Sequence, residues 1–140
     1  MEWHPAMVHF PIVLIPLGLV VDLFALVKRR AEWHIFAYVL SLAGTVSALA
    51  AVLTGNAAAE FYRDDDRVLE QVERHEDLAT LALLLLLAVA LGRMPLQLQR
   101  RFAGWPLKVW IAAAAVGSVL LWITGLRGGE LVYDYGVGVN

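Results

Sequence analysis

The sequence contains no cysteine, and this absence removes several kinds of chemistry. Without a thiol the chain has no disulfide, no thiolate metal ligand and no cysteine nucleophile. Charge is also scarce, because Asp, Glu, Lys and Arg make up only 17% of the 140 residues and leave a net charge of −2. A chain without net positive charge gives no indication of a nucleic-acid partner. Apolar residues make up 60% of the chain and the mean hydropathy is +0.67, values typical of a membrane protein.

Several catalytic motifs are missing as well. The sequence has no glycine-rich phosphate loop, no zinc-protease helix motif and no nucleophile elbow. The string RDDDR, residues 63–67, has the charge for calcium but neither the spacing nor the glycine of an EF-hand loop. We interpret it as a solvated helix cap.

Long apolar runs dominate the rest of the chain. A helix needs about 20 mainly apolar residues to cross a bilayer, and four segments approach that length. The sequence therefore predicts an all-α fold in a single domain, residues 1–140: a four-helix transmembrane bundle built of two helical hairpins. The expected spans are 8–27, 34–53, 78–92 and 108–126, and the third helix is expected to begin outside the membrane near residue 66.

The distribution of basic residues predicts an orientation. Lys and Arg gather after the first span and between the third and fourth, and connections rich in these residues stay in the cytoplasm. We therefore expect a multi-pass protein with both termini outside. The basic residues are Lys28, Arg29, Arg30, Arg93, Arg100, Arg101 and Lys108.

Two similar strings end the second and fourth spans. Residues 54–60 read TGNAAAE and residues 124–130 read TGLRGGE, so each has Thr-Gly with a Glu five residues after the Gly. Each string closes a hairpin whose first helix carries a histidine near its outer end. A parallel internal repeat would place equivalent residues face to face about an axis along the membrane normal. Chance is the alternative, because Thr-Gly commonly ends a helix.

The histidines on the outer side are the main candidate site. Polar groups at a bilayer boundary are costly unless they are paired or used, and helical spacing places His75 on the bundle-facing stripe of its helix. Neutral imidazole binds haem iron axially, or binds a Cu, Fe or Zn ion with carboxylate support. We expect His9 and His75, with His4 nearby, to hold a b-type haem. Glu60 and Glu130 would orient the rings, or would themselves bind the metal if the site holds an ion.

The same histidines also have a purely structural interpretation. Each can bond to one of these glutamates or to a backbone carbonyl and order a helix end without any cofactor. The dipeptide HP at residues 4–5 also suits the start of a helix. The chain would then be a membrane module for assembly or anchoring. His34 lies on the cytoplasmic side beside Trp33, and we interpret it as interfacial.

Asp22 lies inside the first span, toward its cytoplasmic end. An acid within a membrane span is a candidate proton relay, which gives a third hypothesis, a small proton-coupled transporter subunit. For a single acid a structural partner is the favoured alternative. The partners considered are Lys28, Tyr38, Ser41 and Thr45.

The opening string HPAMVHFPIVL, residues 4–14, is followed by Asp22, by Thr-Gly at the end of the second span, by His75 and by the terminal LVYDYGVGV. Together these features resemble a bacterial membrane family catalogued as domain of unknown function 2231, over essentially the whole chain. The resemblance implies a four-helix domain in the bacterial inner membrane, sometimes fused to or beside cytochrome and other redox modules. That association favours haem or metal by analogy only. The family's polar positions map to His4, His9 and His75, and no catalytic role comes with them.

The leading hypothesis is an integral membrane cytochrome-like protein, an electron-transfer or binding protein rather than a catalyst. Its expected partners are the lipid bilayer and either a membrane quinone or a periplasmic redox protein, and no nucleic acid. Small residues on the second and fourth spans would also permit a homodimer.

Overall fold

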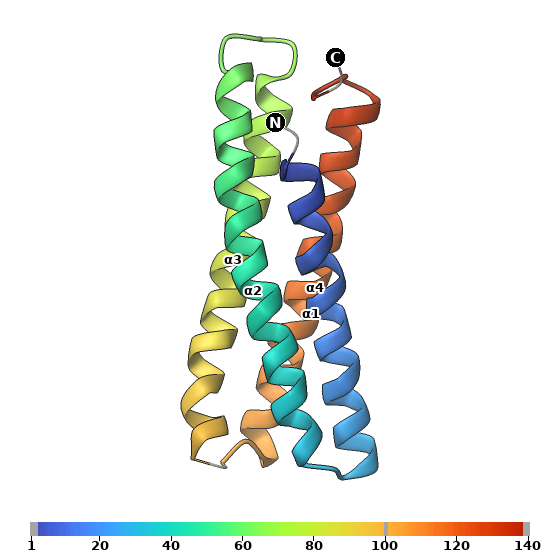
Figure 1. The fold of residues 1–140 in the computed structure, drawn as a ribbon, viewed down its shortest axis with the longest axis vertical. Coiled ribbons are helices and arrows are strands. Elements are labelled where there is room, and N and C mark those ends of the chain that lie inside the picture. Colours follow the sequence, from blue (N-terminus) through green and yellow to red (C-terminus); the bar gives the residue numbers. More distant parts are fainter. Residues whose placement is uncertain (1–2, 100, 139–140) are drawn as a thin grey trace.

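The computed structural model describes residues 3–99 and 101–138, which form four long helices (Figure 1). The described part of the chain contains no strand, so the predicted all-α four-helix fold is confirmed. All four helices are long and apolar enough to cross a membrane. Their bounds are Trp3–Lys28 for α1, Glu32–Ala59 for α2, Leu69–Leu98 for α3 and Gly104–Tyr133 for α4, with a 3-10 turn, η1, at Glu60–Tyr62.

Each helix extends beyond the span expected from hydropathy. Hydropathy marks only the part suited to hydrocarbon, whereas a helix continues until a turn ends it. After α1 that turn is made by Arg29, which has a positive φ of 53°. The N–H of Arg30 then bonds to the carbonyl of Ala25 at 2.9 Å. This is the usual left-handed way of satisfying a carbonyl at a helix end.

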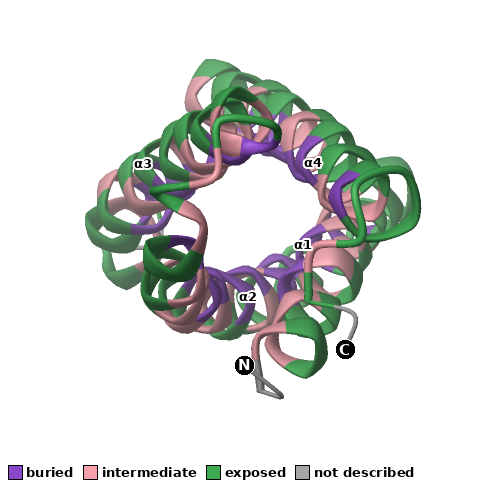
Figure 2. Ribbon diagram, turned by 90° about the horizontal axis from the view of Figure 1, so that it is seen from above, coloured by how far each residue is buried: buried purple, intermediate pink, exposed green. Residues whose placement is uncertain are grey.

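The four helices are arranged as a ring around the bundle axis (Figure 2). Each packs against the two beside it, so α1 lies diagonally opposite α3 and α2 lies diagonally opposite α4. The contact between α1 and α2 is the most extensive. The grouping of the helices into two hairpins related by an internal repeat stays a prediction.

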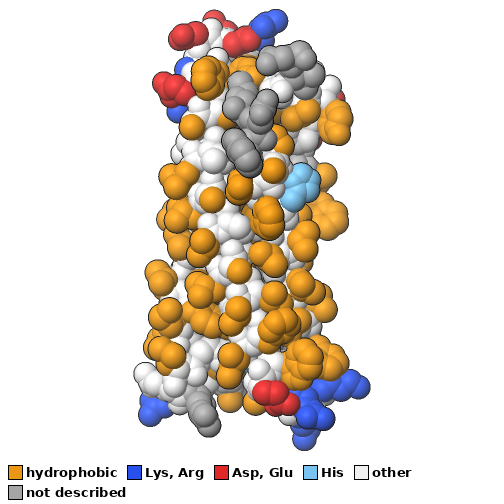
Figure 3. All heavy atoms as spheres, in the orientation of Figure 1, with side chains coloured by type: hydrophobic (Ala, Val, Ile, Leu, Met, Phe, Trp, Pro, Cys, Tyr) orange, Lys and Arg blue, Asp and Glu red, His pale blue; other side chains and the backbone are white. Residues whose placement is uncertain are grey.

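Charged side chains gather at the two ends of the bundle, and apolar side chains cover the length between them (Figure 3). We call one end the acidic end: it holds the start of α1, η1 and the end of α4. The other is the basic end, which holds the connections α1–α2 and α3–α4. The acids of the acidic end are Glu60, Asp64, Asp65, Asp66, Glu70, Glu73, Glu76, Asp77, Glu130 and Asp134; the basic end carries Lys28, Arg29, Arg30, Arg101 and Lys108.

Large apolar side chains point outward along the whole length of the bundle. On α1, for example, Val13 and Val20 are each 59% exposed. A water-soluble bundle would bury these faces, so exposure on this scale suits contact with lipid. The interior has small side chains instead, and a Cβ on Gly44 would lie 2.7 Å from Cδ1 of Ile15. Midway along the axis is the central apolar layer: Ile15, Ala48, Ala82, Leu83, Leu86 and Leu121.

The connection before α3 differs from the aspartate side-chain cap that the sequence predicted. The N-cap of α3 is Val68, and no side chain caps it. The backbone carbonyl of Asp65 accepts from the N–H groups of Val68 and Leu69, at 3.1 and 3.0 Å. The Asp65 carboxylate instead accepts hydrogen bonds from the Arg67 guanidinium, at 2.7 and 2.9 Å. These side-chain hydrogen bonds hold the pKa of Asp65 below its ordinary value.

Candidate functional site

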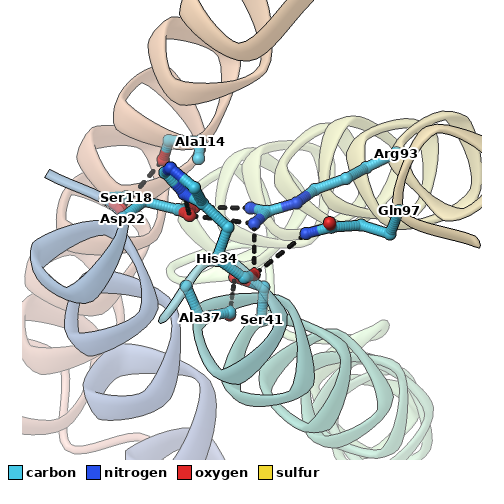
Figure 4. Close-up of polar contacts among 8 residues, drawn as sticks. All are labelled: Asp22, His34, Ala37, Ser41, Arg93, Gln97, Ala114 and Ser118. Carbon is cyan, nitrogen blue, oxygen red and sulfur yellow. Dashed lines mark hydrogen bonds and ion pairs between the residues drawn. The ribbon is translucent and has the colours of Figure 1, made fainter. Parts of the chain in front are cut away.

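Buried or half-buried ionisable residues occupy two places along the bundle axis, one on each side of the central apolar layer. The first is toward the basic end, where Asp22 of α1, His34 of α2 and Arg93 of α3 meet (Figure 4). We call these three residues the buried ionic cluster. Asp22 is 0% exposed and Arg93 only 1% exposed, so the pair is shielded from solvent. Ionisable groups placed in this way within a membrane span are rare and are functional candidates by default.

Arg93 holds the carboxylate of Asp22 through both of its terminal nitrogens. Its Nη2 donates to Oδ1 at 2.8 Å, and its Nη1 donates to Oδ2. The same Nη2 also donates to the backbone carbonyl of His34 at 2.7 Å, and Gln97 donates to that carbonyl at 2.9 Å. A bidentate pair with further hydrogen bonds is the geometry that repays part of the cost of burying two charges. It ties α1, α2 and α3 together.

The imidazole of His34 shares the carboxylate with Arg93. Its Nδ1 lies 2.8 Å from Oδ1 of Asp22. Phe102, in the connection between α3 and α4, lies over both side chains: its ring centroid is 4.1 Å from Cζ of Arg93 and 5.5 Å from the His34 ring centroid. An aromatic face near a guanidinium adds a favourable cation–π contact.

The partners of Asp22 differ from those considered from the sequence. Ser41 and Thr45 donate their hydroxyl hydrogens to carbonyls of their own helix, at 2.9 and 2.8 Å. Tyr38 donates to the carbonyl of Ala90, and Lys28 is exposed at the end of α1. His34 is buried rather than interfacial, with 6% of its surface exposed.

Arg93 is the functional candidate that the sequence analysis missed. It follows directly after the apolar run that ends at Gly92, and it was counted among the flanking cytoplasmic charges. Its side chain lies within the bundle, where it meets an acid from a helix diagonally opposite. The sequence did contain one indication, the position of the two residues along the membrane normal: Asp22 and Arg93 both lie near the basic-end limit of their spans. A single acid within a span is expected to pair with a cation at the same level of the membrane.

The second polar place is at the acidic end, where the rings of His4 and His75 lie against neighbouring helices. They belong to α1 and α3, which are diagonally opposite. Each ring rests on a glycine of another helix. A Cβ on Gly55 of α2 would lie 2.8 Å from Cε1 of His4, and one on Gly128 of α4 would lie 3.1 Å from Cε1 of His75. Two histidines therefore alternate with two glycines around the axis.

The hydrogen bonds of Thr54 determine the tautomer of His4. Its hydroxyl donates its one hydrogen to the carbonyls of Ala50 and Ala51, at 2.9 and 3.0 Å. Toward Nδ1 of His4, at 3.2 Å, the hydroxyl oxygen must therefore accept. Nδ1 then carries the hydrogen of neutral His4, and Nε2 is left with a bare lone pair.

His75 has a buried nitrogen without a partner. Its Nδ1 is fully buried and makes no hydrogen bond. Buried polar atoms are rarely left unpaired, and an exception calls for an explanation such as an unobserved ligand. The inward position of His75 agrees with the prediction from helical spacing.

The other predicted site residues lie apart from this pair. His9 is exposed, and its Nδ1 donates to the carbonyl of Pro5 one turn earlier. Glu60 and Glu130 are exposed and form ion pairs with Arg63 and Arg127, at 3.3 and 2.8 Å. Within residues 3–99 and 101–138 no group of three or more His, Asp or Glu side chains is placed to hold a metal ion. Of the histidines predicted for this end, His4 and His75 pack against glycines of other helices, whereas His9 does not.

An apolar cap closes the acidic end beyond the two histidines. It consists of Ala59, Tyr62, Val68, Val72, Leu131 and Val137. Val137 joins it because the chain turns back after α4, with a positive φ of 68° at Gly136. The N–H of Gly138 then donates to the hydroxyl of Tyr62 at 2.7 Å. The cap packs the connection between α2 and α3 against the end of α4.

Replacing Tyr62 with phenylalanine is expected to loosen this cap. The substitution removes the hydroxyl that accepts from Gly138 and keeps the ring in the cap, so the loss in unfolding free energy is about 1 kcal/mol. Hydrogen exchange of the amides of residues 136–138 should become faster. The control is Tyr133→Phe, since Tyr133 is 89% exposed. Equal exchange rates in the two variants would contradict the role given to Tyr62.

Comparison with known proteins gives one match. No curated protein and no solved structure matches the chain. A family model described as "Predicted membrane protein (DUF2231)" matches residues 2–140. The chain therefore belongs to this family of predicted membrane proteins, as the resemblance of its sequence motifs indicated.

Proposed function

We propose that this membrane protein binds a b-type haem at the acidic end of the bundle, that His4 and His75 would hold its iron, and that the protein transfers electrons. The observation that carries the proposal is the buried Nδ1 of His75, which makes no hydrogen bond, at the same end of the bundle as the His4 imidazole, whose Nε2 is bare. Neutral imidazole nitrogen is a ligand for haem iron.

The number of ligands favours haem over a bare ion. Zinc and non-haem iron sites take three or four ligands, usually with carboxylate or thiolate among them. The described residues offer two imidazoles, and the glutamates considered as further ligands are engaged by arginines on the surface. Haem brings its own nitrogen ligands for the iron, so two histidines from the protein would be enough to hold it.

The arrangement of the bundle also suits a planar group. In helix bundles, cofactor sites are built in the core by side chains on facing helices. Here the two imidazoles come from one diagonal of the ring, α1 and α3, and the bare backbones of Gly55 and Gly128 come from the other diagonal, α2 and α4. The imidazoles fill the space that the missing Cβ atoms leave, so the two glycines hold both rings in the core.

Haem bound there would supply one-electron chemistry, and this chain would set its environment. Thr54 holds the Nδ1–H of His4 and so keeps Nε2 available as a ligand. The apolar cap and the central apolar layer exclude water on either side, and burial of this kind tunes a haem potential. By the positive-inside rule the acidic end faces outward, which in a bacterial inner membrane places the site near a membrane quinone or a periplasmic redox protein.

The direct test is the visible absorption spectrum of protein purified in mild detergent from cells supplied with haem. We expect a Soret band with one haem per chain. The band should be lost in His75→Ala and in His4→Ala, because each removes an axial ligand. His9→Ala is the matched control and should keep the band, since His9 is exposed.

Two results would overturn the proposal. One is a folded protein without a Soret band, whether or not it holds stoichiometric copper, iron or zinc. The other is a band that survives in His4→Ala and disappears in His9→Ala, which would restore the pair expected from the sequence. A protein without haem or metal would instead favour the assembly or anchoring module.

A further inference from the structure

The buried ionic cluster lies at the opposite end of the bundle from the proposed haem site. Electron transfer at the haem would not involve the cluster. Its three side chains carry one permanent positive charge, on Arg93, and one negative charge, on Asp22. With a neutral imidazole the cluster has no net charge. One more proton would give it a charge of +1.

Asp22, although it was the proton relay considered from the sequence, is fully engaged. Oδ2 accepts from Arg93, and Oδ1 accepts from both Arg93 and His34 at 2.8 Å. A guanidinium keeps its proton under all conditions in which proteins fold, and it pairs with a carboxylate rather than with a carboxylic acid. The group that accepts a proton must therefore be another member of the cluster.

His34 is the remaining group. A carboxylate oxygen can only accept, so Nδ1 of His34 carries the hydrogen and Nε2 of the neutral ring is bare. His34 also keeps the largest exposed fraction of the three, 6% against 0% for Asp22 and 1% for Arg93. It therefore has both a free lone pair and a remaining contact with the surroundings of the cluster.

The charged and titratable groups around His34 are few. Asp22 faces it from α1 and Arg93 from α3, while Tyr38 of its own helix lies by the guanidinium, with the ring centroid 5.5 Å from Cζ. Among the described residues, α4 contributes no charged side chain to these contacts. Phe102 lies over the cluster from the connection before α4. The Asp22 carboxylate is therefore the anion that would stabilise an imidazolium.

The surroundings of the cluster differ toward the two ends of the bundle. The central apolar layer fills the bundle between the cluster and the acidic end. At the basic end the cluster is covered by Phe102, which belongs to a connection rather than to a helix. We propose that the buried ionic cluster is a proton-binding site in which His34 takes up the proton, and that the site exchanges protons with the solution at the basic end. This does not depend on a haem at the acidic end.

The test is nitrogen NMR of the full chain labelled with ¹⁵N-histidine in lipid nanodiscs, at about pH 8 and about pH 5. We expect His34 to carry hydrogen on Nδ1 alone at the higher pH and on both nitrogens at the lower. His34→Gln assigns its signals; if that variant does not fold, substituting His4, His9 and His75 in turn assigns them by elimination. A neutral His34 at both pH values in folded protein overturns the proposal, as does hydrogen on Nε2 alone at the higher pH.

The route by which protons reach His34 from the basic end is tested with two variants, each of which removes a phenylalanine. In Phe102→Ala, exchange of the Nδ1 hydrogen of His34 with D₂O should become at least tenfold faster, because the ring that covers the cluster is gone. Phe36→Ala is the matched control, since Phe36 also lies toward the basic end but is 51% exposed. Unchanged exchange in Phe102→Ala would overturn access from the basic end.

Discussion

Replacing Arg93 with alanine is expected to destabilise the folded protein by about 3–5 kcal/mol, the usual cost of removing one partner of a buried ion pair. The substitution leaves the carboxylate of Asp22 buried with only the His34 imidazole beside it. It also frees the His34 carbonyl from its bond to Nη2. The loss can be measured as the free energy of unfolding in mixed micelles as the fraction of SDS is raised.

A matched control lies on the same helix. Arg74 forms an ion pair with Glu70 at 2.6 Å, but the two side chains are 71% and 67% exposed. Exposed pairs contribute little because water screens them and the side chains lose entropy on pairing. Arg74→Ala should therefore leave stability almost unchanged. If Arg93→Ala were no more destabilising than Arg74→Ala, the buried ionic cluster would not be holding the helices together.

A double substitution separates the attraction of the pair from the cost of an orphaned charge. Replacing a buried ion pair by apolar residues of similar size is often neutral, whereas removing one partner is not. Asp22→Leu combined with Arg93→Met should therefore recover much of the stability that Arg93→Ala loses. If the double variant were as unstable as Arg93→Ala, the loss of stability would come from the missing hydrogen bond between Arg93 and the His34 carbonyl.

The four helices were predictable because hydropathy over about 20 residues depends on composition rather than on contacts. The inward face of α3 was predictable for the same kind of reason. That helix begins in a polar segment, so helical spacing separates His75 from its charged neighbours. The identity of the second histidine was not predictable. α1 is apolar on all sides, and no periodicity indicates whether His4 or His9 faces the bundle.

The buried ionic cluster was missed for a different reason. Hydropathy assigns a basic residue at the end of an apolar run to the membrane surface, and it takes no account of the direction in which a long side chain lies. Arg93 extends into the bundle, and its guanidinium meets Asp22 from the diagonally opposite helix. Such a contact depends on the order of the helices around the ring, which a single sequence does not specify.

The second large effect concerns Gly55. In Gly55→Ala the new Cβ would lie 2.8 Å from Cε1 of His4, closer than real Cβ atoms approach other atoms, so the imidazole must move away from Thr54. We expect haem retention to fall at least tenfold. Alanine favours a helix over glycine by about 1 kcal/mol. A loss of haem would therefore arise at the His4 ring and not from a weaker helix.

Gly128 and Gly129 make the experiment quantitative. A Cβ on Gly128 would lie 3.1 Å from Cε1 of His75, a tight contact that a small shift relieves, whereas a Cβ on Gly129 would meet nothing within 4 Å. The expected loss of haem is thus largest in Gly55→Ala, intermediate in Gly128→Ala and absent in Gly129→Ala. Because all three substitutions add the same methyl group to a helix of the same bundle, only the distance to an imidazole differs. A different order would mean that these rings are not the ligands.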